Sequence, residues 1–174
     1  SQISTMRVAV LCRRLSDNTL VRSYLLLKTL PDAKIDVYGL VDDRGLHSYF
    51  DSERFTFHTV GTEGYGDWDG EPTVPDRLRR LSNQGTDSFR LWAHYAYSAP
   101  TPDAVVVASG WKGSVGAGLL AKHLGPWDVP VIVDIFDRIE WAETLPFDPL
   151  SSFDAVVTSN RPLAEQLNGT ALHT

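Results

Sequence analysis

Short runs of apolar and β-branched residues alternate along this chain with stretches in which apolar positions recur every three or four residues. Unbroken apolar runs are typical of strands buried on both faces, and the wider spacing is typical of helices packed on a sheet. The pattern predicts strands at residues 6–12, 35–41, 55–60, 104–108, 131–133 and 153–158. It predicts helices at residues 20–30, 75–81, 87–97 and 161–167 and within 113–125 and 137–145.

The stretch from Asp103 to Asp137 contains the clearest part of this pattern. Its two apolar runs, Ala104–Ala108 and Val131–Val133, are joined by one helix made of small residues. Two strands connected through one helix form a right-handed crossover, in which they lie parallel in the same sheet. We therefore predict that Val105–Val107 and Val131–Val133 are parallel neighbours, and that the chain forms a three-layer α/β domain with a mainly parallel sheet.

Less regular regions are expected between these strands. Phe55 and Phe57 alternate with polar residues, which favours a strand near the edge of the sheet. Residues 61–75 are rich in glycine, proline and acidic side chains, which predicts a long loop. Asn83–Thr86 is expected to separate two helical pieces, with Asp87 capping the second.

Composition limits the classes of function. The chain has 174 residues, enough for one domain with a substantial core, and its formal net charge of -6 argues against non-specific binding of nucleic acid. Cys12 is the only cysteine, no apolar run is long enough to span a membrane, and no signal peptide is visible, which together favour a cytoplasmic protein. Ser1–Thr5 precede Met6 and are expected to be a vector-derived remnant, which leaves residues 6–174 as one domain.

Three segments, taken together, resemble one enzyme family. PDAVVVASGW (102–111), followed by the helix GAGLLAKHLG, resembles a "PDvv-h-hg" strand and an "a-l-a-k-l-g" helix. VPVIVDIFDRIEW (129–141) resembles an "iPvvvD-rDlwpE" segment, and FDAVVTSNRPLAEQL (153–167) resembles "aD-vitvSe-l-e-l". In this order and spacing they are similar to the N-terminal, Rossmann-like domain of a GT-B fold glycosyltransferase of the retaining family-4 group.

The resemblance implies that this chain is half of an enzyme of polysaccharide or secondary-metabolite glycan assembly. In this family the N-terminal domain mainly holds the acceptor, which would be a glycan, a lipid-linked sugar or a small molecule. A C-terminal domain grips the nucleotide-sugar donor with an E-x-F-G-x-x-x-x-E-type motif, which is absent from this sequence. The resemblance therefore implies no cofactor or metal bound by this domain alone, a nucleotide sugar bound through the missing domain, and a cytoplasmic location, with peripheral contact to the inner face of the membrane left open.

Two positions depart from the family pattern. The loop after the first strand, CRRLSDNTL (12–20), lacks the glycine pair that family members often place near the donor phosphates. Arg13 and Arg14 are expected to meet a phosphate by charge instead. Phe136 stands where many relatives have a catalytically important His, and it supplies neither a charge nor a hydrogen bond.

The candidate site is expected at the carboxyl ends of the strands, where open parallel sheets bind ligands. Asp137 is the candidate catalytic residue, as a general base if burial raises its pKa, and Asp134 is expected to accept hydrogen bonds whatever the function. The alternatives are structural: Asp137 as a helix cap, and Trp111 as packing between helix and sheet. The expected substrate-binding residues are Arg13, Arg14, Ser16, Asp17, Asn18, Ser109, Gly110, Trp111, Lys112, Asp134, Arg138, Glu140, Ser159 and Asn160.

Other motifs point to different chemistry less directly. Gly116-x-Gly118-x-x-Ala121 matches a dinucleotide fingerprint formally, but it lies inside a helix rather than in a strand-to-helix turn, which favours helix–sheet packing. The D-x-D sequence at residues 67–69 lies in the predicted loop. The five histidines lack metal-ligand spacing, and neither a G-x-x-x-x-G-K-[ST] loop nor a G-x-S-x-G elbow is present.

Two other functions stay open. A freestanding Rossmann-like module that binds a partner or forms an oligomer without catalysis would account for the missing glycines and for Phe136. A different doubly wound enzyme, such as a response-regulator-like or nucleotide-dependent protein, is supported only by the pair Asp134 and Asp137. A gene that continues for another ~150–200 residues, about one domain, would favour the transferase over the module.

Overall fold

The structure is a computed structural model, and it describes residues 5–15, 18–30, 32–41, 53–62, 74–97, 100–135 and 139–158. The predicted helix at 161–167 and the D-x-D sequence at 67–69 lie outside these residues. The elements, in chain order, are β1 (Arg7–Arg14), α1 (Asn18–Lys28), β2 (Lys34–Val41), β3 (Phe55–Thr62), α2 (Val74–Ala96), β4 (Ala104–Ala108), α3 (Lys112–Leu124), β5 (Val131–Ile135), α4 (Glu140–Glu143) and β6 (Ala155–Thr158).

Within the described residues, the strands form one sheet in the order β3-β2-β1-β4-β5-β6, and all neighbouring pairs are parallel. Val105–Val107 pair in register with Val131–Val133, which confirms the predicted crossover. β3 lies at one edge of this sheet, as its alternating pattern predicted. The chain winds outward from β1 to β3 and then, in the opposite direction, from β4 to β6. The winding therefore reverses between β1 and β4, which is the place where open α/β sheets bind ligands.

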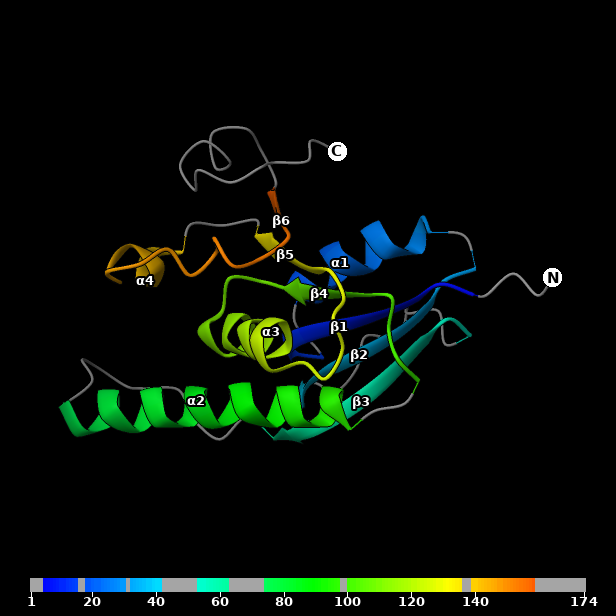
Figure 1. Cartoon of the computed structure of the whole chain (residues 1–174). Coiled ribbons are helices and arrows are strands. Elements are labelled where there is room, and N and C mark those ends of the chain that lie inside the picture. Colours follow the sequence, from blue (N-terminus) through cyan, green and yellow to red (C-terminus); the bar gives the residue numbers. More distant parts are fainter. Residues whose placement is uncertain are drawn as a thin grey trace.

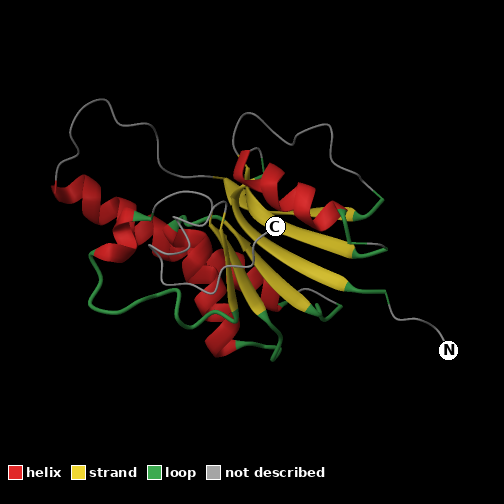
Figure 2. Ribbon diagram, turned by 90° about the horizontal axis from the view of Figure 1, so that it is seen from above, coloured by secondary structure: helices red, strands yellow, loops and turns green. Residues whose placement is uncertain are grey.

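Helices cover both faces of the sheet, with α1 on one face and α2 and α3 on the other (Figures 1 and 2). Because strand side chains alternate between faces, each strand contributes to two cores. Val8 and Val10 belong to the core beneath α1, together with Tyr24. Ala9 and Leu11 belong to the core beneath α2 and α3. This three-layer arrangement confirms the predicted fold class.

The small residues of α3 let this helix lie close to the sheet. A Cβ added to Gly118 would stand 2.5 Å from a methyl carbon of Val107, which is closer than real Cβ atoms approach. Ala117 and Ala121 are fully buried on the same side of the helix. The glycine pattern that resembles a dinucleotide fingerprint therefore serves packing, as its position inside the helix predicted: Gly118 lies against the sheet, and a Cβ on Gly116 would stand 2.5 Å from the hydroxyl of Ser88 in α2.

The expected break in the second helical region was wrong, because α2 runs without interruption from Val74 to Ala96. Gly85 faces open space, where glycine costs a helix only about 1 kcal/mol relative to alanine. The hydroxyl of Thr86 donates to the carbonyl of Ser82 at 3.0 Å, so its polar group is satisfied within the helix. Asp87 accepts from Arg90 in the middle of the helix and does not cap it. Packing of buried Leu91 against the core outweighs these weak local signals.

The first half of α2 extends past the end of α3 (Figures 1 and 2). The hydroxyl of Ser88 donates to the carbonyl of Gly113, in the first turn of α3, at 2.9 Å. At a rise of 1.5 Å per residue, the part of α2 that precedes Ser88 is about 20 Å long. Although α2 is long, none of the helices among the described residues has the length and apolarity needed to cross a bilayer.

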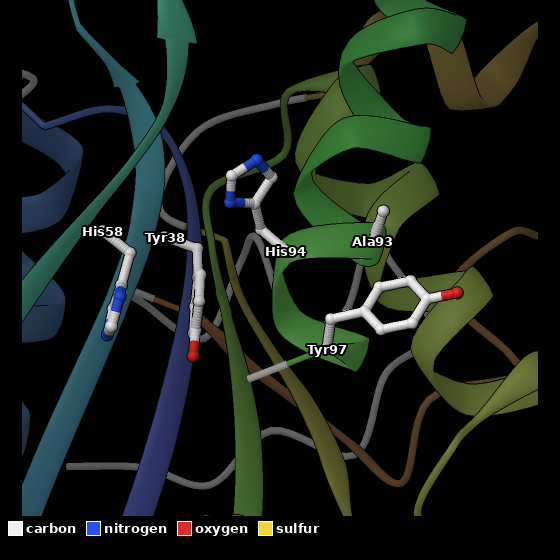
Figure 3. Close-up of a pocket in the computed structure, with 5 residues that line it drawn as sticks. All are labelled: Tyr38, His58, Ala93, His94 and Tyr97. Atoms are coloured by element: carbon white, nitrogen blue, oxygen red, sulfur yellow. The ribbon is translucent and has the colours of Figure 1, made fainter. Parts of the chain in front are cut away.

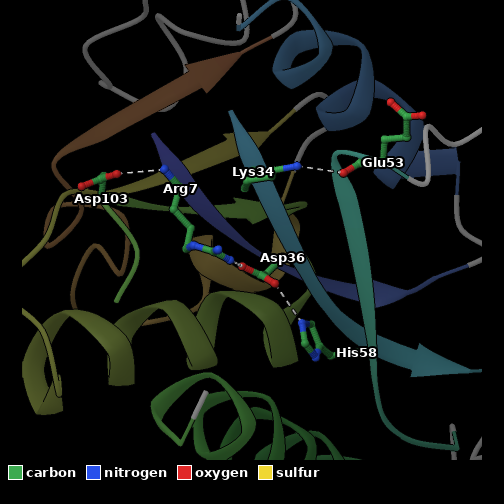
Figure 4. A network of polar contacts seen from close by, with 6 residues as sticks. All are labelled: Arg7, Lys34, Asp36, Glu53, His58 and Asp103. Carbon is green, nitrogen blue, oxygen red and sulfur yellow. Dashed lines mark hydrogen bonds and ion pairs between the residues drawn. The ribbon is translucent and has the colours of Figure 1, made fainter. Parts of the chain in front are cut away.

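A network of ion pairs and hydrogen bonds ties together the amino ends of the strands (Figure 4). Asp36 in β2 accepts from Arg7 in β1 at 2.8 Å and lies 3.0 Å from His58 in β3. The backbone N–H of Arg7 donates to the carboxylate of Asp103, just before β4, at 2.8 Å. Lys34 donates to the carbonyl of Glu53 at 3.1 Å. The network thus joins the starts of β1, β2, β3 and β4.

The end of α1 is held by Arg54, which immediately precedes β3. Its guanidinium donates to the carbonyls of Leu27, Lys28 and Leu30, and to that of Ala33 in the following turn. The last carbonyls of a helix have no partner inside the helix, so Arg54 supplies donors that α1 itself lacks.

Candidate functional site

β1 shifts its register as it approaches its carboxyl end. Leu11 pairs with Tyr38 of β2, but Arg14 pairs with Leu40, so three steps along β1 correspond to two along β2. A shift of this kind bends the strand and is common beside binding sites. Arg13 lies within the shifted segment, next to the point where the winding of the sheet reverses.

The loop that leaves β4 is tightly constrained. Ser109 has a φ of 145°, a conformation that favours glycine, and its hydroxyl accepts from the N–H of Trp111 at 3.3 Å. The indole N–H of Trp141 donates to the carbonyl of Gly110 at 2.7 Å. A Cβ on Gly110 would lie 2.1 Å from Ile139, so only glycine fits here. Strained residues of this kind cluster at functional sites.

Arg13 and Trp111 meet across β1 and β4. The guanidinium carbon of Arg13 lies 5.2 Å from the centroid of the Trp111 ring, within the range of a cation–π interaction. The same ring lies against the first turn of α3, where a Cβ on Gly113 would stand 2.3 Å from it. The indole nitrogen of Trp111 is buried and has no hydrogen-bond partner. These contacts confirm the packing role that was weighed for Trp111, and its role in a binding site stays a prediction.

Asp134, near the carboxyl end of β5, faces α1. Both of its carboxylate oxygens accept from Nε of Arg22, at 2.8 and 3.1 Å, and Oδ2 also lies 3.4 Å from the hydroxyl of Ser23. Burial raises the pKa of Asp134 above its ordinary value, while the hydrogen bond and charge of Arg22 act to lower this pKa. The short ion pair argues that Asp134 is a carboxylate at neutral pH. The expected hydrogen-bonding role of Asp134 is confirmed, and its partners belong to the fold.

The predicted site residues divide into three sets. One set meets where β1, β4 and α3 adjoin, and it consists of Arg13, Ser109, Gly110, Trp111 and Lys112. A second set lies around it: Arg14 ends β1, Asn18 begins α1, Asp134 lies in β5 and exposed Glu140 begins α4. The third set lies outside the described residues, so its roles stay predictions, and it consists of Ser16, Asp17, Asp137, Arg138, Ser159 and Asn160.

Arg22, at this edge, was not predicted from the sequence, and the contact of Trp141 was not predicted either. Arg22 carries a charge among the apolar positions of α1, and that position was the available signal that it needs a buried partner. Trp141 lies in the segment that carries the family resemblance, but nothing in the sequence links its indole to Gly110, which is 31 positions earlier.

A separate cavity of about 420 Å³ lies between the sheet and the end of α2 (Figure 3). Tyr38 and His58 stack with their ring centroids 4.5 Å apart, and Tyr97 is 91% exposed. Tyr95, close by, is buried, and burial followed by the proximity of Tyr38 raises its pKa to about 12. The cavity lies halfway along the strands and away from their carboxyl ends. The residues that line it are Tyr38, His58, Ala93, His94 and Tyr97.

No metal centre is evident in the part of the chain that the structure describes, because no group of three or more His, Cys, Asp or Glu side chains there is arranged to hold an ion.

Comparisons with known proteins connect this chain to others by fold. No protein-family profile matches the chain, and no curated protein matches it by sequence. Its structure is similar to that of UGT89C1 from Arabidopsis thaliana, solved with UDP, with a TM-score of 0.55 and 12% identity over 90% of this chain and 43% of that one. It is also similar to a UDP-N-acetylglucosamine 2-epimerase, with a TM-score of 0.52 and 14% identity over 95% of this chain and 45% of that one.

At these identities the likeness concerns the fold alone. The chain spans less than half the length of either structure. The six-stranded parallel sheet flanked by helices is therefore a Rossmann-like domain of the GT-B-like type.

Proposed function

We propose that this domain is the acceptor-side half of a glycosyltransferase that moves a sugar from a nucleotide-sugar donor to a glycan, a lipid-linked sugar or a small molecule. The observation that carries the proposal is the cluster of Arg13, Ser109 and Trp111 at the point where the winding of a GT-B-like sheet reverses. The resemblance of three sequence segments to family-4 glycosyltransferases supports it independently. The solved structure with UDP shares the fold, which is compatible with a nucleotide sugar held by a second domain.

In this proposal the residues at the carboxyl edge bind and orient the acceptor. Arg13 and Lys112 supply positive charge in a protein whose net charge is -6, so they attract an anionic group to this edge. The backbone at Gly110 is covered by Ile139 and that at Gly113 by the indole of Trp111, so in this structure the side chains of this edge are what meets the ligand. Asp134 does not serve as the base, because Arg22 and Ser23 occupy its carboxylate.

The catalytic step is assigned to the cleft between this domain and the donor domain. Asp137 stays the candidate base, since Asp134 is engaged by α1. Positive groups and amide dipoles stabilise a leaving diphosphate without a metal ion in reactions of this type. The family-4 assignment and a retaining outcome rest on the sequence resemblance, and Phe136 departs from that pattern.

The test is transfer by the full-length gene product. We expect it to release nucleotide from at least one UDP-, GDP- or dTDP-sugar, faster when an acceptor is present. Replacement of Arg13 by Gln should lower kcat/KM about tenfold or more, as for the loss of a charged contact worth about 1.5–3 kcal/mol. Arg54→Gln is the matched control, because it also replaces an arginine by glutamine but at the end of α1, where Arg54 caps the helix.

Two results would count against the proposal. The absence of both nucleotide-sugar binding and nucleotide release in the folded full-length protein would favour a non-catalytic binding module. Release that is unaffected by Arg13→Gln would move the acceptor site away from the carboxyl edge.

A further inference from the structure

The indole of Trp111 lies in a position that leaves its polar group unsatisfied. Its ring covers Gly113 so closely that a Cβ there would stand 2.3 Å from it. The guanidinium carbon of Arg13 lies 5.2 Å from the centroid of the same ring. The indole nitrogen is buried without a hydrogen-bond partner. Leaving a buried donor unpaired is unfavourable, so packing against the core holds this position against a penalty that an outward rotation would remove.

The loop that carries Trp111 is fixed up to the preceding residue. Trp141 holds the carbonyl of Gly110 at 2.7 Å, and Ser109 is strained, with a φ of 145°. Motion of the indole therefore needs rotation about the side-chain bonds of Trp111 and the loss of its packing against the core, while the backbone at Ser109 and Gly110 stays in place. The ring atoms nearest to Gly113 belong to the far end of the indole, which travels farthest in such a rotation.

We propose that Trp111 is a displaceable cover of the acceptor site, and that a sugar bearing a phosphate group displaces it. This inference rests on the proposed function. In the closed position the indole covers Arg13 and Gly113. In the open position both residues face the ligand. The guanidinium then exchanges a cation–π contact for two parallel hydrogen bonds to phosphate, which are stronger. The open indole gains a partner for its nitrogen from water or from a sugar hydroxyl.

Gly113→Ala tests the cover without any ligand. Alanine suits a helix, but its Cβ overlaps the closed indole, so the ring has to leave. The matched control is Gly85→Ala, in α2, where a Cβ meets nothing within 4 Å. We expect acrylamide to quench Trp111 at least twofold more in Gly113→Ala than in the wild type or Gly85→Ala. Emission from Trp111 is obtained by subtracting the spectrum of the matching Trp111→Phe variant.

The ligand is tested with glucose 1-phosphate, titrated by calorimetry into the full-length protein. Because part of the binding energy of the wild type is used to open the cover, Gly113→Ala should bind about fivefold more tightly. Gly85→Ala should bind like the wild type, and Arg13→Gln at least tenfold more weakly. Should Gly113→Ala fail to fold, Arg13→Gln replaces it in the quenching experiment, since loss of the cation should also expose the indole.

Different results overturn different parts of the proposal. If acrylamide quenches Trp111 no more in folded Gly113→Ala than in the wild type, the cover is refuted, whatever the transfer assay shows. An exposed Trp111 combined with no binding of glucose 1-phosphate to either protein would refute the ligand class. Sugar transfer itself would then still be judged by nucleotide release.

Discussion

The two ends of the sheet are built differently. At the amino ends, polar side chains pair with one another across strands, as Asp36 does with both Arg7 and His58. At the carboxyl ends of β1 and β4, Ser109 is strained and the indole nitrogen of Trp111 is buried without a partner. The first arrangement holds strands together, whereas the second contains unfavourable local features that a ligand would relieve under the proposed function. Under that proposal, the amino ends of the strands support the fold and the carboxyl ends bind the acceptor.

The largest expected effect tests whether the carboxyl end also contains a structural pair. Arg22→Met should destabilise the protein by about 3 kcal/mol at pH 7, because it leaves the carboxylate of Asp134 buried without a partner. The pKa of Asp134, already raised by burial, should rise further. The folded state then binds the proton more tightly than the unfolded state, so stability falls as pH rises from the ordinary value of 3.8 through the raised pKa.

Urea unfolding of Arg22→Met at pH 4 and pH 7 measures this effect. The deficit relative to the wild type should be smaller at pH 4, where a larger fraction of Asp134 is protonated than at pH 7 because its pKa is raised. An equal deficit at both values would show that lost packing of the Arg22 side chain, and not the buried charge, causes the instability.

A smaller effect is expected at the amino ends. Asp36→Asn removes the carboxylate charge that contacts both Arg7 and His58. It should lower the free energy of unfolding by about 1–2 kcal/mol, the usual range for partly buried charged hydrogen bonds. Thermal unfolding measures the loss. Binding of glucose 1-phosphate should stay unchanged, since the network lies at the opposite end of the strands. A change in affinity would break the separation drawn between the two ends.

At Ser109 the comparison predicts a gain in stability. Ser109→Gly should stabilise the fold by about 1 kcal/mol, because glycine adopts a φ of 145° without strain. Ser109→Ala keeps the Cβ and loses the hydroxyl that accepts from Trp111, so it should give no gain. Denaturant midpoints for the two variants check the difference. A gain with alanine equal to that with glycine would point to the hydroxyl rather than the backbone.

The smallest effect concerns the ion pair between Lys122 of α3 and Asp154, which precedes β6. Their side chains are 25% and 39% exposed, so Lys122→Met should cost no more than about 0.5 kcal/mol. The hydrogen bond from Lys122 is the largest cause that lowers the pKa of Asp154. That contribution is present above the ordinary value of 3.8 and is lost as pH falls through the lowered pKa. The acid side of the stability curve should therefore flatten in Lys122→Met, and an unchanged slope would contradict this assignment.

Sequence patterns predicted the strands well because burial on both faces leaves a direct signature. Val105–Val107 and Val131–Val133 are continuous apolar runs, and a parallel central strand has no polar face to interrupt them. The small residues around Gly118 likewise indicated close packing of a helix on the sheet. Helix α2 was predicted less well, since Asn83 to Thr86 have weak helical preference, and packing against α3 decided the outcome.

The sequence placed the candidate residues at one edge of the sheet, but it did not predict their contacts. The rule that ligands bind at carboxyl ends selected Arg13 and Trp111 together. The guanidinium of Arg13 lies over the ring of Trp111 where β1 shifts its register, and such a shift carries no sequence signature. The partner of Asp134 was equally hidden, because Arg22 is 112 positions away in the chain. Contacts between distant segments are set by the assembled sheet, and local pattern does not contain them.

The cap that Arg54 places on α1 has a consequence for the order of assembly. Four carbonyls at the end of α1 and in the turn after it are satisfied by a residue that is synthesised 21 to 27 positions later. A chain released after β2 would lack the donors of Arg54, and α1 would fray from its last turn. The first half of the domain should therefore become protease-resistant only when the start of β3 has emerged, so that β1, α1, β2 and β3 mature as one unit.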